Sequence, residues 1–314
     1  IYYILRNNYI MAIKLGTSDI SKVYLGATEV SKIYLGATEV YSAASPFITT
    51  WRTTGINQTI TIPTTGSGYN YDITTSDGQS FTGETGNKTI TFATAGDYDV
   101  EISGDFPRIY FNTVGDRLKL VDIVQWGSIA WTSFNSAFNG CDSLTNTSFT
   151  DAPDLSSVTD MSAMFRFCRN LTSLELTNWD VSNVTDMSYM LRRASSLPTL
   201  TLSNWDVSNV TDMQYMMMNT DSLSDYPLSN WDINKVADFS NFLAFTDVST
   251  SSYDAILIGW EATLQAEFPS GTGYTPTINI SFSGGKYTGG GAAATARASL
   301  VSNFGWTITD SGTV

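Results

Sequence analysis

The 314-residue chain contains no histidine, and this absence excludes several kinds of chemistry. Without imidazole there is no Ser-His-Asp or Cys-His nucleophile pair, no His-liganded zinc or haem, and no His proton shuttle near neutral pH. The chain also has only two cysteines and no run of about 18 apolar residues, so it predicts neither a disulfide scaffold nor a membrane-inserted segment. We therefore expect a protein that is not an enzyme and carries no cofactor.

Positive charge is also scarce. Only 15% of residues are charged, and 30 Asp and Glu outnumber 16 Lys and Arg, which gives a formal charge of −14. This sign disfavours nucleic acid and anionic membranes as partners, because the electrostatic attraction that drives such binding is reversed. With 42% hydrophobic residues, the chain can nevertheless bury real cores, and its length suggests two or three domains.

Residues 13–42 hold three copies of a ten-residue repeat, namely IKLGTSDISK, VYLGATEVSK and IYLGATEVYS. Apolar positions alternate around a Gly-x-x-acid turn, which predicts short strands joined by tight turns. Such hairpins are marginal in water alone, so they need another domain, another copy of the chain or a larger assembly. We predict a β-hairpin anchor over residues 1–45. Residues 1–10 make a poor signal peptide, and Met11 is the more natural start, so whether they belong to the mature chain stays open.

Residues 46–112 have a different pattern, in which β-branched and aromatic runs alternate with Gly, Asp and Ser turns. This pattern predicts a small antiparallel β-sandwich with strands at 59–63, 69–73, 88–92 and 97–103. The tail, residues 251–314, predicts an α/β cap with helices at 253–260 and 291–303 and strands at 278–282 and 305–309.

Residues 113–250 contain a longer repeat with a period of 26, in which NWDVSNVTDMSYM starts at 178 and recurs at 204 and, degraded, at 230. The leucines of LTSLEL (171–176) and LPTLTL (197–202) keep the same spacing. The pattern predicts a leucine-rich-repeat solenoid whose coils each contain a short strand, a turn and a short helical or 3₁₀ segment. In that segment Thr185 or Asp186 would cap the first turn, and Met187 and Met190 would point inward.

Three stretches carry resemblances to known families. The run WDVSNVTDMSYM, with its relatives FNGCDSL and FRFCRNL, resembles the BspA-like surface-protein repeat, also called the mycoplasma lipoprotein-type repeat. FATAGDYDVEISG (92–104) is similar to PKD-type or immunoglobulin-like modules, although their WGDG turn is absent. LGATEVSKIYLGATEVY (25–41) is similar to segments near the start of bacteriophage virion proteins.

Together the resemblances imply a mainly β, modular phage adhesin, such as a tail fibre or tail-tip protein. Residues 11–45 would attach it to tail or baseplate proteins, and the coils would contact a host cell-surface glycan or protein. The resemblance places the protein in the virion tail. Fibres are often trimeric, whereas a capped solenoid can be monomeric, so a homotrimer and a monomer both stay open.

Other interpretations use the same modules. A bacterial cell-surface adhesin would need an export signal or an anchor, and neither is visible in the sequence. A capsid decoration or head fibre would place the chain elsewhere on the virion. An enzyme that degrades polysaccharide is disfavoured, because nothing in the sequence selects a pair of catalytic carboxylates.

Residues repeated in every coil are candidates for the core. A tryptophan ladder invites stacking on sugars, but identical placement in successive coils favours burial. The tryptophans are Trp179, Trp205 and Trp231, and the corresponding methionines are Met161, Met187 and Met213. Cys141 and Cys168 take equivalent positions in adjacent coils, which favours buried reduced thiols over a disulfide between them.

Aspartates also recur with the period of 26, at Asp180, Asp186, Asp206 and Asp212. Calcium is the cation that such clustered carboxylates would bind. However, their loops lack the EF-hand and β-roll spacings, so helix capping and hydrogen bonds within turns are favoured and no metal site is predicted.

Basic residues gather at one place in the coils. Residues 113–250 carry 7 basic and 16 acidic residues, a formal charge of −9, yet four arginines lie at nearly equivalent positions in two successive coils with two tyrosines close by. We predict a patch that binds an anionic surface glycan, and the alternative is pairing of the arginines with aspartates of the coils. The candidate ligand-binding residues are Arg166, Arg169, Arg192, Arg193, Tyr189 and Tyr215.

Overall fold

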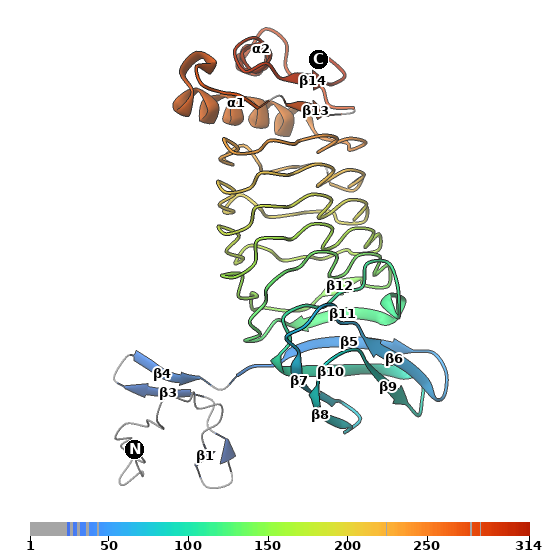
Figure 1. Ribbon diagram of the computed structural model, residues 1–314. Coiled ribbons are helices and arrows are strands. Elements are labelled where there is room, and N and C mark those ends of the chain that lie inside the picture. Colours follow the sequence, from blue (N-terminus) through green and yellow to red (C-terminus); the bar gives the residue numbers. More distant parts are fainter. Residues whose placement is uncertain are drawn as a thin grey trace. The chain divides into compact units, whose positions relative to one another are not determined.

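The computed structural model describes residues 24–25, 28–29, 32–35, 38–42, 44–223, 225–276, 278–282 and 284–314. The chain divides into two compact units, residues 1–45 and 46–314. As the sequence predicts, the protein is mainly β, and its sheets are open (Figure 1). Among the described residues, no helix combines the length and the apolar character needed to span a membrane.

In the first unit, the described residues form two antiparallel hairpins. Strand β1 (Tyr24–Leu25) pairs with β2 (Thr28–Glu29), and β3 (Lys32–Leu35) pairs with β4 (Thr38–Ser42). The short paired strands predicted for the second and third decamers are therefore confirmed, whereas residues 26–27 and 36–37 between them lie outside the described residues. The first decamer and residues 1–10 lie outside the described residues.

The second unit begins with two sheets. The strands are β5 (Phe47–Thr53), β6 (Gln58–Ile62), β7 (Asn70–Thr75), β8 (Ser80–Glu84), β9 (Lys88–Phe92) and β10 (Gly96–Asp105). Strands β6 and β9 form a two-stranded sheet, and the other four belong to a six-stranded sheet in the order β12-β11-β5-β10-β7-β8. All four strands predicted between 46 and 112 are confirmed, and β5 and β8 are additional.

The six-stranded sheet continues into the coils. After the 3₁₀ turn η1 (Arg117–Lys119), β11 (Leu120–Gln125) pairs antiparallel with β5 and parallel with β12 (Asn146–Thr147) of the next coil. One hydrophobic core consequently extends from Phe47 to Trp306. The predicted boundaries after residues 112 and 250 fall inside this single compact unit.

The coils are joined by alternating backbone hydrogen bonds. In residues 161–167, 187–193 and 213–219, every second residue donates its N–H to a carbonyl 25 residues later, as Met187 does to Asp212 at 3.0 Å and Tyr189 does to Gln214 at 2.9 Å. The residues between them donate to carbonyls three positions back, as Met190 does to Met187 at 3.2 Å. Each coil therefore repeats tight turns that are hydrogen-bonded to the next coil.

This geometry corrects the predicted content of a coil. Within residues 150–249, apart from 224, the structure has isolated bridges between Asp160, Asp186, Asp212 and Asp238 but no strand or helix. The short strands expected at 171–176 and 197–202 and the helical segment after Thr185 are therefore wrong. After Thr185 the reason is a left-handed backbone, with φ of 59° at Tyr189, which closes a turn instead of continuing a helix.

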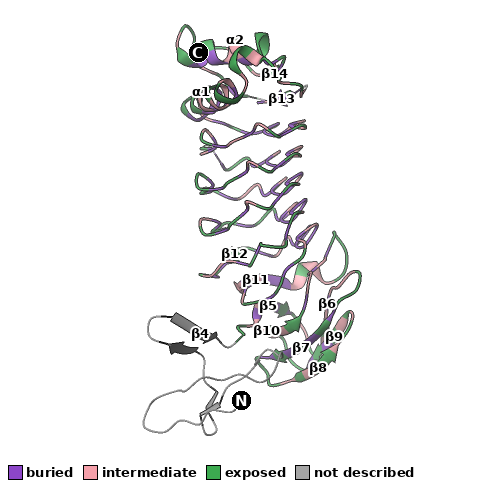
Figure 2. Cartoon of the chain, turned by 60° about the vertical axis from the view of Figure 1, so that its left-hand side comes forward, coloured by how far each residue is buried: buried purple, intermediate pink, exposed green. Residues whose placement is uncertain are grey.

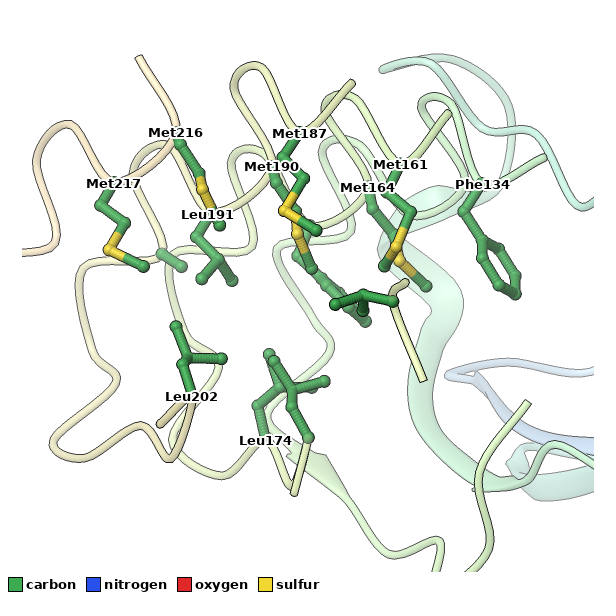
Figure 3. Close-up of a cluster of buried hydrophobic side chains, with 14 of the residues drawn as sticks. Phe134, Met161, Met164, Leu174, Met187, Met190, Leu191, Leu202, Met216 and Met217 are labelled. Atoms are coloured by element: carbon green, nitrogen blue, oxygen red, sulfur yellow. The ribbon is translucent and has the colours of Figure 1, made fainter. Parts of the chain in front are cut away.

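Identical side chains stack inside the coils. Met161, Met187 and Met213 are fully buried, and the three ladder tryptophans are at most 4% exposed. Figure 3 shows methionine and leucine side chains of successive coils directed into one interior, and Figure 2 shows buried residues recurring from coil to coil. Trp205 Nε1 also donates to the carbonyl oxygen of Leu176 in the preceding coil at 3.1 Å. The predicted burial of both ladders is confirmed.

A helical cap closes the far end of the coils. It contains α1 (Thr250–Glu267), η2 (Pro269–Gly271), β13 (Asn279–Ser281), α2 (Ala292–Ser302) and β14 (Thr307–Thr309), which confirms all four elements predicted there. Ser249 caps α1 by accepting a hydrogen bond from the Ser252 N–H. Helix α1 approaches the last coil so closely that a Cβ on Gly259 would lie 1.9 Å from the Ser229 carbonyl oxygen.

Candidate functional site

Two positions in each coil have a left-handed backbone. The backbone at these positions sets the direction of the side chains on the outer surface of the coils. The first is occupied by Ala163, Tyr189, Tyr215 and Asn241, and the second by Phe167, Arg193, Asn219 and Phe245, with φ between 53° and 62°. For residues other than glycine this conformation costs roughly 1–3 kcal/mol and persists only where the surroundings impose it. Here the hydrogen bonds between coils impose it, since Tyr189 and Arg193 both donate their N–H groups to the following coil.

Arginine side chains lie over aromatic rings at these outer positions. The rings of Tyr189 and Tyr215 stack with centroids 4.8 Å apart and planes at 12°. Arg192 Cζ lies 5.6 Å from the Tyr189 centroid and 5.2 Å from that of Tyr215. Arg166 Cζ lies 4.5 Å from the Phe167 centroid and 5.1 Å from that of Tyr189. Cations and ring faces therefore alternate across neighbouring coils.

The two remaining arginines meet the same phenylalanine. Arg169 Cζ lies 5.3 Å and Arg193 Cζ 5.6 Å from the Phe167 centroid. The structure thus brings all six predicted residues into one cluster, in which the four arginines lie over Phe167 and two of them, Arg166 and Arg192, also lie over the tyrosine rings. We call this cluster the Arg-aromatic patch, and it consists of Arg166, Phe167, Arg169, Tyr189, Arg192, Arg193 and Tyr215.

Most of the positive charge in the patch has no carboxylate partner. Arg169 Nη1 pairs with Asp142 Oδ2 at 2.6 Å, so local pairing explains that arginine. Within the described parts of the chain, Arg166, Arg192 and Arg193 form no salt bridge and donate no side-chain hydrogen bond. The pKa of Arg166 is lowered by burial and by the neighbouring charge of Arg192. These three like charges repel one another, and a bound anion would relieve that repulsion.

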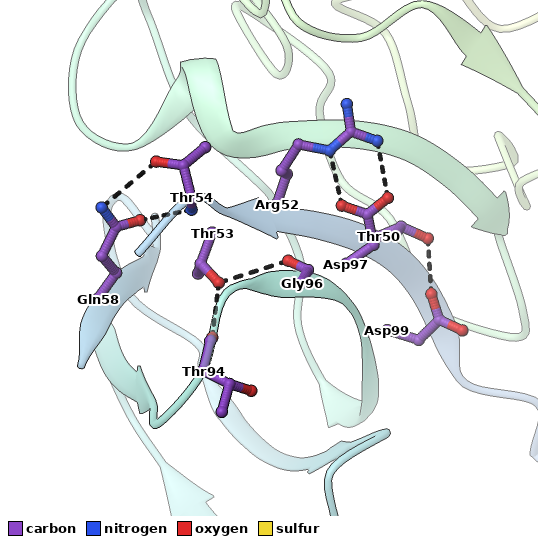
Figure 4. Close-up of polar contacts among 9 residues, drawn as sticks. All are labelled: Thr50, Arg52, Thr53, Thr54, Gln58, Thr94, Gly96, Asp97 and Asp99. Carbon is purple, nitrogen blue, oxygen red and sulfur yellow. Dashed lines mark hydrogen bonds and ion pairs between the residues drawn. The ribbon is translucent and has the colours of Figure 1, made fainter. Parts of the chain in front are cut away.

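An arginine in the six-stranded sheet shows the opposite arrangement. Arg52 on β5 makes two 2.7 Å bonds to the carboxylate of Asp97 on β10, as Figure 4 shows. Those bonds hold the pKa of Asp97 below its usual range. An arginine of this protein can therefore be fully paired with a carboxylate, which is the arrangement that Arg166, Arg192 and Arg193 lack within the described residues.

Sequence reasoning missed two residues of this surface. Phe167 precedes Arg193 by 26 residues and therefore occupies the equivalent position in the preceding coil. The period of the repeat alone was sufficient to place Phe167 beside the predicted arginines. Arg117, in η1, lies against Gly140, where an added Cβ would be 3.0 Å from Arg117 Cδ and Nε. Gly140 is the equivalent of Phe167 in the preceding coil, and its missing side chain leaves the space that Arg117 fills.

The repeated aspartates act within turns. Asp186 Oδ1 accepts a hydrogen bond from the Ser188 N–H at 2.8 Å, and Asp212 Oδ1 does so from Gln214 at 2.9 Å. The turn role is confirmed, whereas helix capping is wrong because no helix follows. Burial raises the pKa of Asp186, and the charges of Asp160 and Asp212 add to this shift. No group of three or more acidic or cysteine side chains among the described residues is arranged to hold a metal ion.

The tryptophan side of the coils has an open hollow of about 350 Å³. It is lined by Thr177, Asn178, Trp179, Asp180, Val181, Asn204 and Asp206. Trp179 is 3% exposed, so its ring face is not available to stack on a sugar.

The two thiols are also inaccessible. Cys141 and Cys168 are free and fully buried, as predicted, and burial raises the pKa of both. Cys168 Sγ donates to the Phe138 carbonyl oxygen at 3.2 Å. Neither cysteine contributes to an exposed site.

Comparison with known families places the patch in a recognisable repeat region. Residues 132–255 match the family described as "Mycoplasma protein of unknown function, DUF285". This is the kind of domain found in BspA-like surface proteins. No curated protein and no solved structure matches the chain. The matched residues include every member of the Arg-aromatic patch. The segments that resemble PKD-type modules and bacteriophage virion proteins, residues 92–104 and 25–41, lie outside the matched residues.

Proposed function

We propose that the protein is a non-enzymatic adhesin that binds an anionic ligand on a cell surface through the Arg-aromatic patch. The observation that carries this proposal is the set of three guanidinium groups, on Arg166, Arg192 and Arg193, that aromatic rings hold without carboxylate partners among the described residues. Such groups are preorganised donors for carboxylate, sulfate or phosphate oxygens. Aspartates are plentiful in this region, so the unpaired charge is not a consequence of their scarcity.

In this proposal each module has a separate task. The coils of residues 113–250 form a leucine-rich-repeat solenoid of the BspA-like kind that faces the host, and residues 251–314 cap it. Residues 46–112 act as an immunoglobulin-like spacer. Residues 11–45 attach the protein to tail or baseplate proteins of a phage virion, a role supported by the two short hairpins, which need a partner to be stable.

A bacterial cell-surface adhesin is the second candidate. It is favoured by the description of the matching family as a Mycoplasma protein. Immunogold electron microscopy with antibodies against residues 46–314 would separate the candidates by location. Label on phage tails supports the first proposal, label on the cell envelope supports the second, and label on capsids supports a head fibre or decoration protein.

Adsorption of the purified full chain to cells tests the binding role directly. We expect the double substitution Arg166→Glu and Arg192→Glu to reduce adsorption at least about tenfold, because it places two carboxylates in the patch. The matched control is Arg52→Glu with Lys235→Glu, which makes the same change in net charge at positions outside the patch. Arg193→Glu, at an exposed position, provides a second patch variant that is easier to fold.

Circular dichroism melting should show that these variants remain folded. Unchanged adsorption of folded patch variants, or an equal loss in the control, would contradict the proposed role of the patch.

A further inference from the structure

The positive charge of the patch continues one coil further, to Arg117. The Gly140 N–H donates to the Arg166 carbonyl oxygen at 2.8 Å, so the coil that contains Gly140 is the direct neighbour of the coil that contains Arg166. Arg117 covers Gly140, and its Nε is buried without a hydrogen-bond partner. In the described residues Arg117 has no ion pair, although Asp116 and Lys119 on either side of it pair with each other at 2.8 Å.

Arg117, Arg166 and Arg192 consequently form a row that runs along the direction in which the coils are stacked. Arg117 lies on the first coil of the row, Arg166 belongs to the second and Arg192 to the third. Hydrogen-bonded neighbouring chains lie about 4.8 Å apart, so the row extends over about 10 Å. That length exceeds a single sugar ring, and a ligand that meets the whole row must have more than one unit.

The surroundings of the row favour a saccharide over other polyanions. Phe167, Tyr189 and Tyr215 are half-buried, so the part of each aromatic side chain that the arginines leave uncovered adds exposed apolar area beside the row. Nucleic acid would extend a dense line of phosphates over coils with a formal charge of −9, where the electrostatic term is repulsive. An acidic saccharide carries fewer anions, one on each acidic unit, and neutral ring and hydroxyl surface between them.

We infer that the ligand of the patch is an acidic oligosaccharide that lies along the row, with carboxylate or sulfate groups of different sugar units at Arg117 and at the Arg166–Arg192 pair. This inference rests on the proposed adhesin function and specifies its ligand class and the length of the site. Arg117 is then the residue that distinguishes an oligosaccharide from a single acidic sugar.

Calorimetric titration of the full chain tests the ligand class. The probes are galacturonic acid, tetragalacturonate, its methyl ester, a chondroitin sulfate tetrasaccharide and a short oligo-dT. We expect at least one acidic tetrasaccharide to bind about tenfold or more tightly than the monosaccharide, a difference that additional ion contacts readily supply. Chondroitin sulfate carries sulfate in addition to carboxylate groups, so its comparison with tetragalacturonate shows whether sulfate groups strengthen binding. Equal binding of the ester, no gain with length, tighter binding of oligo-dT, or no binding of either tetrasaccharide would overturn the inference.

Arg117→Gln tests the length of the site. We expect it to weaken binding of the preferred tetrasaccharide about five- to tenfold and to leave monosaccharide binding unchanged. Arg117→Lys should restore part of the loss, and Lys235→Gln is the control for removal of one positive charge elsewhere on the coils. An equal effect of Arg117→Gln on both ligands, or no effect on either, would contradict the extended site.

The two proposals fail in different ways. If charge reversal in the patch abolishes adsorption but no acidic oligosaccharide binds, the inference about the ligand is wrong and the adhesin proposal stands. If folded charge-reversal variants adsorb normally, the adhesin proposal itself fails.

Discussion

Inside the coils, the residues at positions 161, 187 and 213 are methionine and the residue at 239 is phenylalanine, whereas at the outer positions 189, 215 and 241 they are tyrosine, tyrosine and asparagine. The inner side chains pack on their counterparts in adjacent coils, so each level needs an apolar side chain that fills the interior. The outer side chains are placed by backbone hydrogen bonds between coils, which do not depend on the side chain. The fold therefore tolerates polar and aromatic side chains outside while it requires large apolar side chains inside.

The largest difference between the two regions should appear on truncation of a methionine. We expect Met187→Ala to lower the free energy of unfolding by about 2–5 kcal/mol, because it leaves a cavity among fully buried neighbours. Met218→Ala makes the same chemical change at a half-buried outer position and should cost less than about 1 kcal/mol. Denaturant unfolding measures both, and equal losses would remove the distinction between inner and outer positions.

A smaller effect of opposite sign is expected at an outer left-handed position. Phe245 has a φ of 56° and is 59% exposed, so its ring contributes little packing while its Cβ is strained. Phe245→Gly should raise the free energy of unfolding by up to about 1 kcal/mol, after the greater entropy of glycine in the unfolded chain is subtracted. Phe245→Ala removes the ring but keeps the Cβ, and thermal melting should show no comparable gain. A gain in both variants would mean that the ring, and not the backbone, was unfavourable.

The smallest effect concerns the aspartates that link the coils, and it depends on pH. Folding raises the pKa of Asp186, so the native state binds the proton more strongly and the ionised carboxylate opposes folding at neutral pH. Asp186→Asn keeps the oxygen that accepts the Ser188 N–H bond and should raise stability at pH 7 by less than about 1 kcal/mol. The advantage should shrink as the pH falls through the raised pKa of Asp186. Denaturant midpoints of both proteins across pH 3–7 would show this convergence, and an advantage that grows at low pH would contradict it.

The sequence predicted the features that depend on periodicity and local composition. The recurrence of Trp179, Trp205 and Trp231 was sufficient to predict burial, and the alternating and helical patterns located β6, β7, β9 and β10 and the strands and helices of the cap. It also predicted the six polar and aromatic members of the patch, because equivalent positions in successive coils must be neighbours. Their role in binding stays a prediction.

Other features depend on contacts that no local pattern encodes. The pairing of β5 with β11 joins segments about 70 residues apart, and it makes the sheet and the coils share one core. The turns at Tyr189 and Arg193 were missed because left-handed backbone is usually supplied by glycine. Arg117 was missed because it lies outside the repeat and reaches the patch only through the space above Gly140.

The register of 26 residues between coils also limits how this protein can change in length. Because each coil donates to the next at the same positions, removal or duplication of one whole coil between residues 160 and 238 would leave matching donors, acceptors and methionines on either side of the junction. Loss of a single residue there would instead shift the inner side chains out of line with their neighbours. The distance between the sheet and the cap can therefore grow or shrink in whole coils, and the outer surface can gain or lose a level of binding residues at each step.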